Sequence, residues 1–213
     1  MRALSICHNH RSISSLPRFS CTGWATLKVY PPAMPPVAPP TVYTPRLILR
    51  EWRPADLDAF AAIHADPDVR RFVGNGRPLS RLEAEEEING FLSEWNRLGH
   101  GRWAVEERAS GELVGSCGLL SWQEGTPGAC PEVAYGFAQS RWGKGIATEA
   151  ARSSIAWALQ ALTFERVVGL THPDNVASQH VLEKCGMTYA GEAQGRHGLL
   201  RLYAADRSSV VLR

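Results

Sequence analysis

The segment Gln139-Ser-Arg-Trp-Gly-Lys-Gly-Ile-Ala-Thr-Glu-Ala150 joins a predicted strand to a predicted helix through a turn rich in small residues. The small side chains of Gly143, Gly145 and Ala147 allow the backbone of this turn to approach a ligand closely. The helix that follows directs its unpaired N–H groups and the positive end of its dipole at the turn. The segment therefore predicts a binding site for a pyrophosphate or another anion. The side chain of Lys144 either adds charge to this site or points to solvent.

Two common phosphate-binding motifs fit this turn poorly. A P-loop requires Ser or Thr directly after Gly-Lys, whereas Gly145 follows Lys144 here. A dinucleotide-binding fingerprint requires a third Gly or Ala at the position that Thr148 occupies. A tight turn with a purely structural role is a further alternative.

Outward from the turn, hydrophobic periodicity predicts alternating strands and helices. The predicted strands are Arg46–Trp52, Arg102–Glu107, Leu113–Leu120, Glu132–Ala138, Arg166–Leu170, about Thr188–Glu192 and about Leu199–Val211. The predicted helices are Pro54–Ala65, Ser80–Leu98, Ala147–Leu162 and Asn175–Cys185. Strands followed by strand–helix units indicate a mixed α/β sheet with helices on both faces.

Two further segments narrow the choice of family. They are Asn175-Val-Ala-Ser-Gln-His-Val-Leu-Glu-Lys-Cys-Gly-Met187 and the opening Thr44-Pro-Arg-Leu-Ile-Leu-Arg-Glu-Trp52. Together with the Gly-rich turn, and in this order, they resemble the GNAT superfamily of N-acetyltransferases. Trp142-Gly-Lys-Gly-Ile-Ala147 is similar to the acetyl-CoA pyrophosphate loop of that family, usually Gln/Arg-x-x-Gly-x-Gly/Ala. Trp142 stands where the general pattern is often polar, and this departure is familiar in the branch that resembles RimJ and RimL.

The resemblance implies a GNAT-type mixed, mostly antiparallel sheet of six to seven strands, flanked by helices on both faces. It also implies acetyl-CoA as a co-substrate; we expect no metal, because the histidines are scattered without ligand spacing. The strand Glu132–Ala138 would splay from Arg166–Leu170, and the pantetheine arm would lie in the gap between them, bonded to backbone near Phe137. The cofactor-binding residues implied by the resemblance are Phe137, Trp142, Gly143, Lys144, Gly145, Ile146, Ala147, Thr148 and Asn175.

Direct transfer of an acetyl group from a thioester needs a neutral amine, a polarised carbonyl and a proton for the departing thiolate. By resemblance, Glu132 is the candidate general base, acting directly or through water, and Ser178 the candidate proton donor. The alternative for Glu132 is a solvated carboxylate at a strand edge. The alternatives for Ser178 are a helix-face serine or local capping with Asn175, the predicted N-cap. Tyr203 either belongs to the core or reaches the thioester.

Other reactive residues give weaker patterns. A ping-pong mechanism through Cys130 or Cys185 would need an activating histidine, but His180 lies five residues before Cys185, so the two do not share a helix face. The five cysteines and the histidines lack the spacing of a disulfide framework or a metal site. Glu149 is interpreted as a carboxylate that compensates the helix dipole.

Charge and composition indicate which partners, location and domain boundaries to expect. The formal net charge is +2 and basic runs are missing from the sequence, so we expect no nucleic-acid partner. Apolar runs stay below the roughly 18 residues that span a bilayer, so we expect no membrane partner and a cytoplasmic location. Residues 1–43 contain no acidic residue and many prolines, which predicts a disordered extension before a domain at 44–213. The extension is either a transit peptide or the product of an upstream start, with Met34 as the true first residue.

The sequence therefore predicts an N-acetyltransferase that moves an acetyl group from acetyl-CoA to a primary amine, either a protein N-terminus or a small molecule. Specificity would lie in Asp56–Leu98 and in the loop Gly191–Gly198. The oligomeric state is open between monomer and homodimer. The alternative from another functional class is a non-catalytic acyl-CoA sensor or interaction module.

Overall fold

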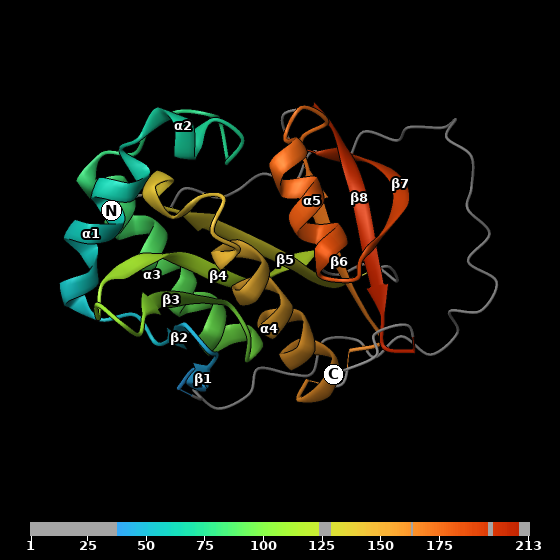
Figure 1. Ribbon diagram of the computed structural model, residues 1–213, viewed down its shortest axis with the longest axis horizontal. Helices are drawn as coiled ribbons and strands as arrows, with labels where there is room; N and C mark the ends of the chain where they lie inside the picture. The colour runs from blue at the N-terminus through green and yellow to red at the C-terminus, as the bar shows by residue number, and fades with distance from the viewer. Residues whose placement is uncertain (1–37, 124–128, 163, 196–197, 209–213) are drawn as a thin grey trace, which may run out of the picture.

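The structure is a computed structural model that describes residues 38–123, 129–162, 164–195 and 198–208 (Figure 1). The disorder expected for the N-terminal extension falls largely on residues 1–37, which lie outside the described residues. The first described strand, Val42–Tyr43, begins just before the domain boundary expected at Thr44.

The described strands form one eight-stranded sheet in the order β1-β2-β3-β4-β5-β6-β8-β7. Every neighbouring pair is antiparallel except β5 and β6, which confirms the mostly antiparallel sheet. Their bounds are β1 Val42–Tyr43, β2 Leu47–Arg50, β3 Arg102–Glu107, β4 Leu113–Trp122, β5 Cys130–Phe137, β6 Arg166–Thr171, β7 Thr188–Gly195 and β8 Gly198–Asp206. The count exceeds the expected six to seven because two-residue β1 is too short to show a period of two.

The helices are α1 Leu57–His64, α2 Pro67–Arg70, α3 Arg81–Leu98, α4 Ile146–Gln160 and α5 Val176–Lys184, with 3-10 turns at Pro54–Asp56 and Gln139–Arg141. Ser80 caps α3: its hydroxyl accepts the Glu83 N–H at 3.3 Å, and the Glu83 carboxylate accepts the Ser80 N–H at 2.8 Å. Helix α2 was not predicted, because four residues carry too little periodicity to distinguish a helix from a loop.

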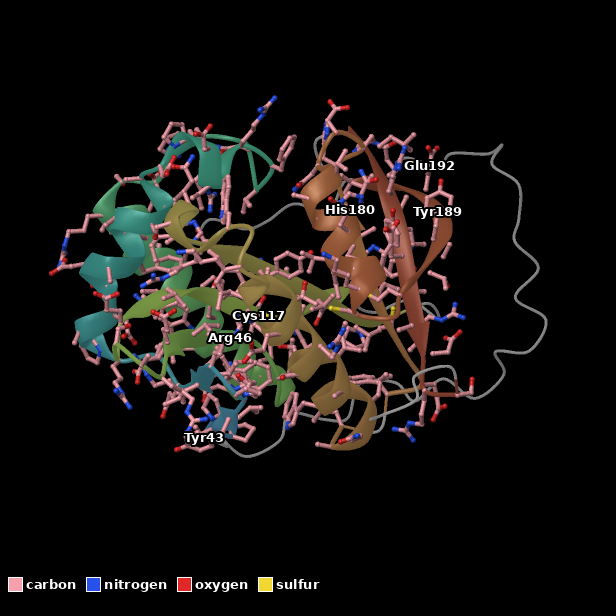
Figure 2. All side chains as sticks on the ribbon, viewed as in Figure 1. Tyr43, Arg46, Cys117, His180, Tyr189 and Glu192 are labelled. Carbon is pink, nitrogen blue, oxygen red and sulfur yellow. The ribbon has the colours of Figure 1, made fainter. Side chains whose placement is uncertain are left out.

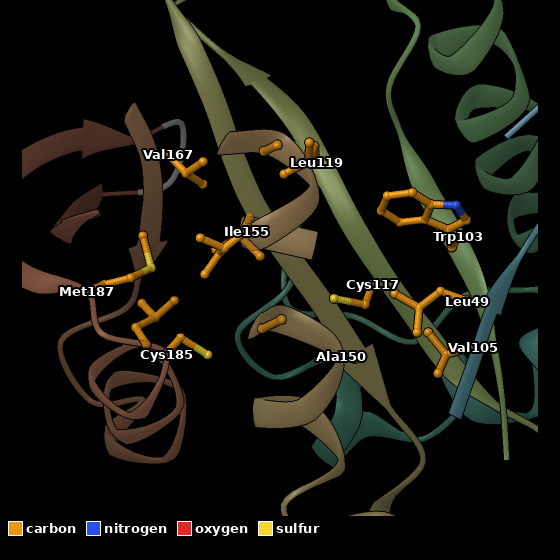
Figure 3. Close-up of a cluster of buried hydrophobic side chains, with 14 of the residues drawn as sticks. Leu49, Trp103, Val105, Cys117, Leu119, Ala150, Ile155, Val167, Cys185 and Met187 are labelled. Carbon is orange, nitrogen blue, oxygen red and sulfur yellow. The ribbon is translucent and has the colours of Figure 1, made fainter. Parts of the chain in front are cut away.

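Helices cover both faces of the sheet, as predicted (Figure 1). Side chains alternate along β3, so Trp103 and Val105 face α4 while Ala104 faces α1 and α3. The larger core cluster lies between the sheet and α4 with α5, as Figure 3 shows for Leu119, Ile155 and other buried residues. A second cluster holds Trp52, Phe60, Ala84, Ile88, Phe91 and Ala104. The two clusters fix the sheet between its helical layers.

Strands β5 and β6 are neighbours over only a short distance. They share a single register pair, Glu132 with Val168. Beyond it, β5 continues to Phe137 paired with β4, and β6 continues to Thr171 paired with β8. The carboxyl-terminal halves of the two parallel strands therefore diverge, as the sequence analysis expected, and leave a gap in the sheet.

The C-terminal hairpin differs from its prediction. Strand β7 runs to Gly195 rather than Glu192, because its pairing with β8 continues to the Gly195–Gly198 pair. Its side chains are mostly exposed and the register shifts between Tyr189 and Gly191, so alternation was too weak to mark its end. Strand β8 ends at Asp206 rather than near Val211, which lies outside the described residues.

Candidate active site

The Gly-rich turn presents backbone donors at the start of α4. Gly143 and Gly145 adopt left-handed backbone conformations, with φ of 73° and 76°. Gly145 is the N-cap, and the first helical bond of α4 runs from the Glu149 N–H to its carbonyl at 3.0 Å. The N–H groups of residues 146–148 precede that bond and lack helical partners, so they form the donor set that an anion would meet.

The side chains of this turn differ in what they can contribute. Ile146 is buried in the core, so only its N–H faces the turn. Lys144 is exposed. A Cβ on Gly143 would meet nothing within 4 Å, whereas one on Gly145 would lie 3.4 Å from the Arg46 Nη2 atom. The turn is therefore open at Gly143 and is contacted by the Arg46 side chain at Gly145.

Side chains from the segment just before strand β2 form a brace that holds the turn from behind. Arg46 donates through Nη1 to the Lys144 carbonyl at 2.8 Å and through Nε to the Glu149 carboxylate at 2.6 Å (Figure 2). Glu149 also accepts from the Thr44 hydroxyl at 2.6 Å and from the Arg46 N–H at 2.9 Å. Although partial burial acts to raise the pKa of Glu149, these hydrogen bonds outweigh it and lower that pKa. Sequence analysis assigned Glu149 to the helix dipole and missed Arg46, which lies about a hundred residues away.

Trp142 links the turn to the end of β5. Its indole N–H donates to the Phe137 carbonyl at 2.9 Å. The Ala138 N–H donates to the Val114 carbonyl on β4. Because backbone groups alternate sides in an antiparallel pair, those of Tyr135 and Phe137 point away from β4, toward the gap. The groups that the gap can offer to a ligand are therefore the Phe137 N–H and the N–H and carbonyl of Tyr135.

Ser178 lies in the first turn of α5, across the gap from β5. Asn175 caps that helix as predicted, since its Oδ1 accepts the Ser178 N–H at 3.2 Å. The Ser178 hydroxyl is not the cap; it lies 2.9 Å from the hydroxyl of Tyr135 on β5. Burial raises the pKa of Tyr135 well above its usual value, so this hydroxyl keeps its proton. Sequence reasoning missed Tyr135, since it had read this strand for backbone contacts and for Glu132 alone.

Glu132 lies on the opposite face of β5 from Tyr135. Val133 and Tyr135 pack on the α4 side, so alternation directs Glu132 to the side of α1 and α3. Burial raises the pKa of Glu132 to about 7, and the positive charge of Arg102 partly opposes the shift. The alternative of a fully solvated carboxylate at a strand edge does not match this raised pKa, which burial causes. A carboxyl group that titrates near neutrality can accept a proton at physiological pH.

His64 lies beneath β5 on the same face as Glu132. It is 1% exposed, stacks on Phe60, and lies 3.4 Å from the position that a Cβ on Gly136 would occupy. Burial, reinforced by the charges of Arg70 and Arg102, lowers its pKa to about 3, so it is neutral. Its ring nitrogens have no hydrogen-bond partner among the described residues. The sequence analysis set His64 aside among the scattered histidines.

The segment around α2 contacts both sides of the gap. The Gln139 side chain, just after β5, donates to Asp68 at 3.0 Å. The Phe72 ring stacks on His172, just after β6, with ring centroids 5.3 Å apart. This segment therefore spans the ends of both diverging strands and lies within the region expected to control specificity.

Several other sequence-based candidates do not join the site. Tyr203 is 2% exposed and packs in the core, with its ring against Tyr189. Burial raises the pKa of Cys130 to about 12 and that of Cys185 to about 11, so both are neutral thiols. Figure 2 shows His180 on α5, where it is exposed. In the part of the chain that the structure describes, no group of three or more His, Cys, Asp or Glu residues could hold a metal ion. The helices among those residues are too short or too polar to cross a membrane.

Comparisons with known proteins agree with this geometry. The sequence model of the acetyltransferase (GNAT) domain matches residues 46–188. The YkkB protein of Bacillus subtilis is 32% identical over 133 residues, covering 62% of this chain and 74% of that protein. The FsC-acetyl coenzyme A-N(2)-transacetylase of Aspergillus fumigatus is 30% identical over 158 residues, covering 71% and 66%.

Among solved structures, RimJ of Mycobacterium smegmatis in complex with CoA-disulfide superimposes with a TM-score of 0.70. The two share 23% identity over 84% of this chain and 93% of that one, a likeness that concerns the fold. The family match covers the Gly-rich turn, the diverging strands and the capped α5. The chain belongs to the GNAT acetyltransferase family.

Proposed function

We propose that this enzyme transfers the acetyl group of acetyl-CoA to a primary amine by direct attack, with Glu132 and Ser178 handling the protons. The observation that carries the proposal is the gap between β5 and β6. It opens beyond the Glu132–Val168 pair toward the end of β5, where the donor-rich turn of α4 follows, and Ser178 lies across it from Tyr135. The catalytic unit is the domain expected at residues 44–213, extended by strand β1.

The turn before α4 would hold the pyrophosphate. Its N–H groups at residues 146–148 supply donors, and the helix dipole adds a partial positive charge. Trp142, Gly143 and Lys144 shape the turn, while Arg46 fixes its backbone from behind. Beyond the turn, the N–H of Phe137 and the backbone groups of Tyr135 would pair with the amides of the pantetheine arm, and Asn175 closes the other side at α5.

The two proton-handling residues lie on opposite faces of the sheet. Three positions separate Glu132 from Tyr135 along β5, which is about 10 Å of strand. Glu132 would accept the proton of the amine on the α1 and α3 side. Ser178 would donate a proton to the departing sulphur on the α4 and α5 side. Acetyl-CoA supplies the reactive thioester, and the protein orients it and moves protons.

The neutral thiols argue for direct attack rather than an acetylated cysteine. A thiol with a pKa near 11 or 12 is almost wholly protonated at neutral pH, and the thiolate is the nucleophilic form. The acceptor is proposed as a protein N-terminus or a small amine. The transacetylase of Aspergillus fumigatus, which its name describes as acting on an N(2) position, is consistent with an amine acceptor.

The first test is isothermal titration of the full chain with acetyl-CoA. Saturable binding is expected, and Gly145→Glu should abolish it by placing a carboxylate among the anion donors. Gly76→Glu is the control: its φ of 78° is close to the 76° of Gly145, and a Cβ at either position would have its nearest contact at 3.4 Å, so it carries similar backbone strain away from the turn. Absence of binding by the wild-type protein, or equal loss in both variants, would contradict the proposed cofactor site.

Turnover is the second test. Release of the CoA thiol is followed with a panel of small amines and N-terminal peptides as acceptors. Glu132→Gln and Ser178→Ala should each lower kcat at least about tenfold, which is typical of lost proton-transfer help, while acetyl-CoA binding stays unchanged. Tight binding with no turnover toward any amine would instead support a non-catalytic sensor.

A further inference from the structure

A pair of hydroxyl groups bridges the gap on its α4 and α5 side. The Tyr135 hydroxyl lies 2.9 Å from the Ser178 Oγ and 3.3 Å from the Ser178 carbonyl oxygen. Tyr135 belongs to β5 and Ser178 to α5, so the pair joins the two elements that border the gap. The Tyr135 ring packs against the main core cluster, which fixes the position of its hydroxyl.

The two hydroxyls can share their hydrogens in two ways. In the first, Tyr135 donates to the Ser178 carbonyl and accepts the hydrogen of Ser178, which is then not available to another acceptor. In the second, Tyr135 donates to Ser178 Oγ, and the hydrogen of Ser178 is free for another acceptor. Only the second arrangement lets Ser178 act as a proton donor to sulphur.

The second arrangement also stabilises the charge that forms on Ser178. As a hydroxyl gives up its proton, its oxygen becomes a stronger acceptor, and hydrogen bonds to charged groups are stronger than those between neutral groups. Tyr135 is half-buried, and its raised pKa keeps its proton in place, so it can supply this bond throughout the reaction.

We propose that Tyr135 is a positioning residue for acetyl transfer: it donates to Ser178 Oγ and so directs the Ser178 hydrogen at the departing sulphur. In this step the amine nitrogen bonds to the acetyl carbon, the carbon–sulphur electron pair goes to sulphur, and the Ser178 proton moves to that sulphur. Glu132 takes the proton that the amine releases and passes it to solvent, solvent returns a proton to the Ser178 oxygen, and Tyr135 keeps its hydrogen. This inference rests on the proposed role of Ser178.

A double-mutant cycle on kcat tests the inference. The variants are Tyr135→Phe, Ser178→Ala and their combination, with Tyr43→Phe as the control, since Tyr43 lies exposed on β1 at the far end of the sheet from β7 (Figure 2). Tyr135→Phe should lower kcat about tenfold, the equivalent of one charge-assisted hydrogen bond, with the KM for acetyl-CoA within twofold of wild type. In the Ser178→Ala background it should have no further effect, because coupled residues are not additive. Tyr43→Phe should leave kcat unchanged.

The outcomes distinguish a failure of the proposed role of Ser178 from a failure of the positioning role of Tyr135. An unchanged kcat in Ser178→Ala would remove the proposed role of Ser178 and this inference with it. A lowered kcat in Ser178→Ala with an unchanged kcat in Tyr135→Phe would overturn the inference alone, as would an equal loss from Tyr135→Phe in both backgrounds.

If Tyr135→Phe fails to fold, the cycle is repeated with 2,3-difluorotyrosine at position 135, which keeps the shape and donates more strongly. The inference then requires a higher kcat in the otherwise wild-type chain and no change in the Ser178→Ala background. A lower or unchanged kcat in the otherwise wild-type chain would overturn it.

Discussion

Replacing Glu132 by Gln should stabilise the protein at alkaline pH while lowering its activity. The side chains are nearly the same size, so the substitution mainly removes the ability to ionise. Burial raises the pKa of Glu132 from an ordinary 4.5 to about 7, which means that the folded protein holds this proton more tightly than the unfolded chain does.

The sign of the effect follows from proton linkage. Between pH 4.5 and 7 the folded state binds more protons at Glu132 than the unfolded state, so the free energy of unfolding falls as the pH rises. The contribution of the protonated carboxyl is fully present below pH 4.5 and is lost as the pH passes 7. Across the whole window, Glu132 changes the free energy of unfolding by about 3 kcal/mol. Between pH 5 and pH 8 the change is about 2 kcal/mol.

The assay is urea unfolding of wild type and Glu132→Gln at pH 5 and pH 8. The free-energy difference between the variant and the wild type should shift by about 2 kcal/mol in favour of the variant between these two conditions. All other titrating groups are shared by the two chains, so their pH dependence cancels. A difference that stays constant within about 0.5 kcal/mol would refute the buried, proton-binding environment assigned to Glu132.

Three further predictions concern catalysis and folding. The kcat/KM of the wild-type enzyme should show an inflection near pH 7 that is absent in Glu132→Gln; an unchanged profile in that variant would exclude Glu132 as the titrating group. Gly118→Ala should destabilise the fold by about 2 kcal/mol or more, because a Cβ there would overlap the Gly101 carbonyl oxygen. Gly90→Ala in α3 is the comparison: its Cβ would meet nothing within 4 Å, so the variant should be neutral or stabilise the fold by up to about 1 kcal/mol. Urea unfolding of both variants measures the difference. Glu149→Ala should cost about 1 kcal/mol after solvent screening and weaken acetyl-CoA binding, since the brace behind the turn is lost; calorimetry showing full-affinity binding would contradict that coupling.

The sequence predicted the parts of the site that depend on local chemistry. Glycines at positions 143 and 145 predicted a turn whose backbone can approach a ligand before a helix, and Asn175 predicted an N-cap, because such preferences act within a few residues. The order of strands and helices was also readable, since amphipathic periods reflect which face of each element is buried.

Other parts of the site depend on contacts between distant segments. Tyr135 and Ser178 are 43 residues apart, and Arg46 reaches Glu149 across 103 residues, so neither contact leaves a local pattern. The environment of Glu132 was equally hidden, because the burial that raises the pKa of its carboxyl and the charge of Arg102 that opposes this shift both arise only in the folded chain. Short β1 and α2 were missed for a simpler reason, since two and four residues show no period.

A crystal structure of the full chain with bound CoA would test the proposed site most directly. We expect the pyrophosphate to lie against the N–H groups at residues 146–148, the pantetheine arm to lie between β5 and β6, and the sulphur to lie within hydrogen-bond distance of Ser178 Oγ. Density for the pyrophosphate away from the turn of α4, or a sulphur far from both Ser178 and Glu132, would contradict the arrangement on which the proposed chemistry depends.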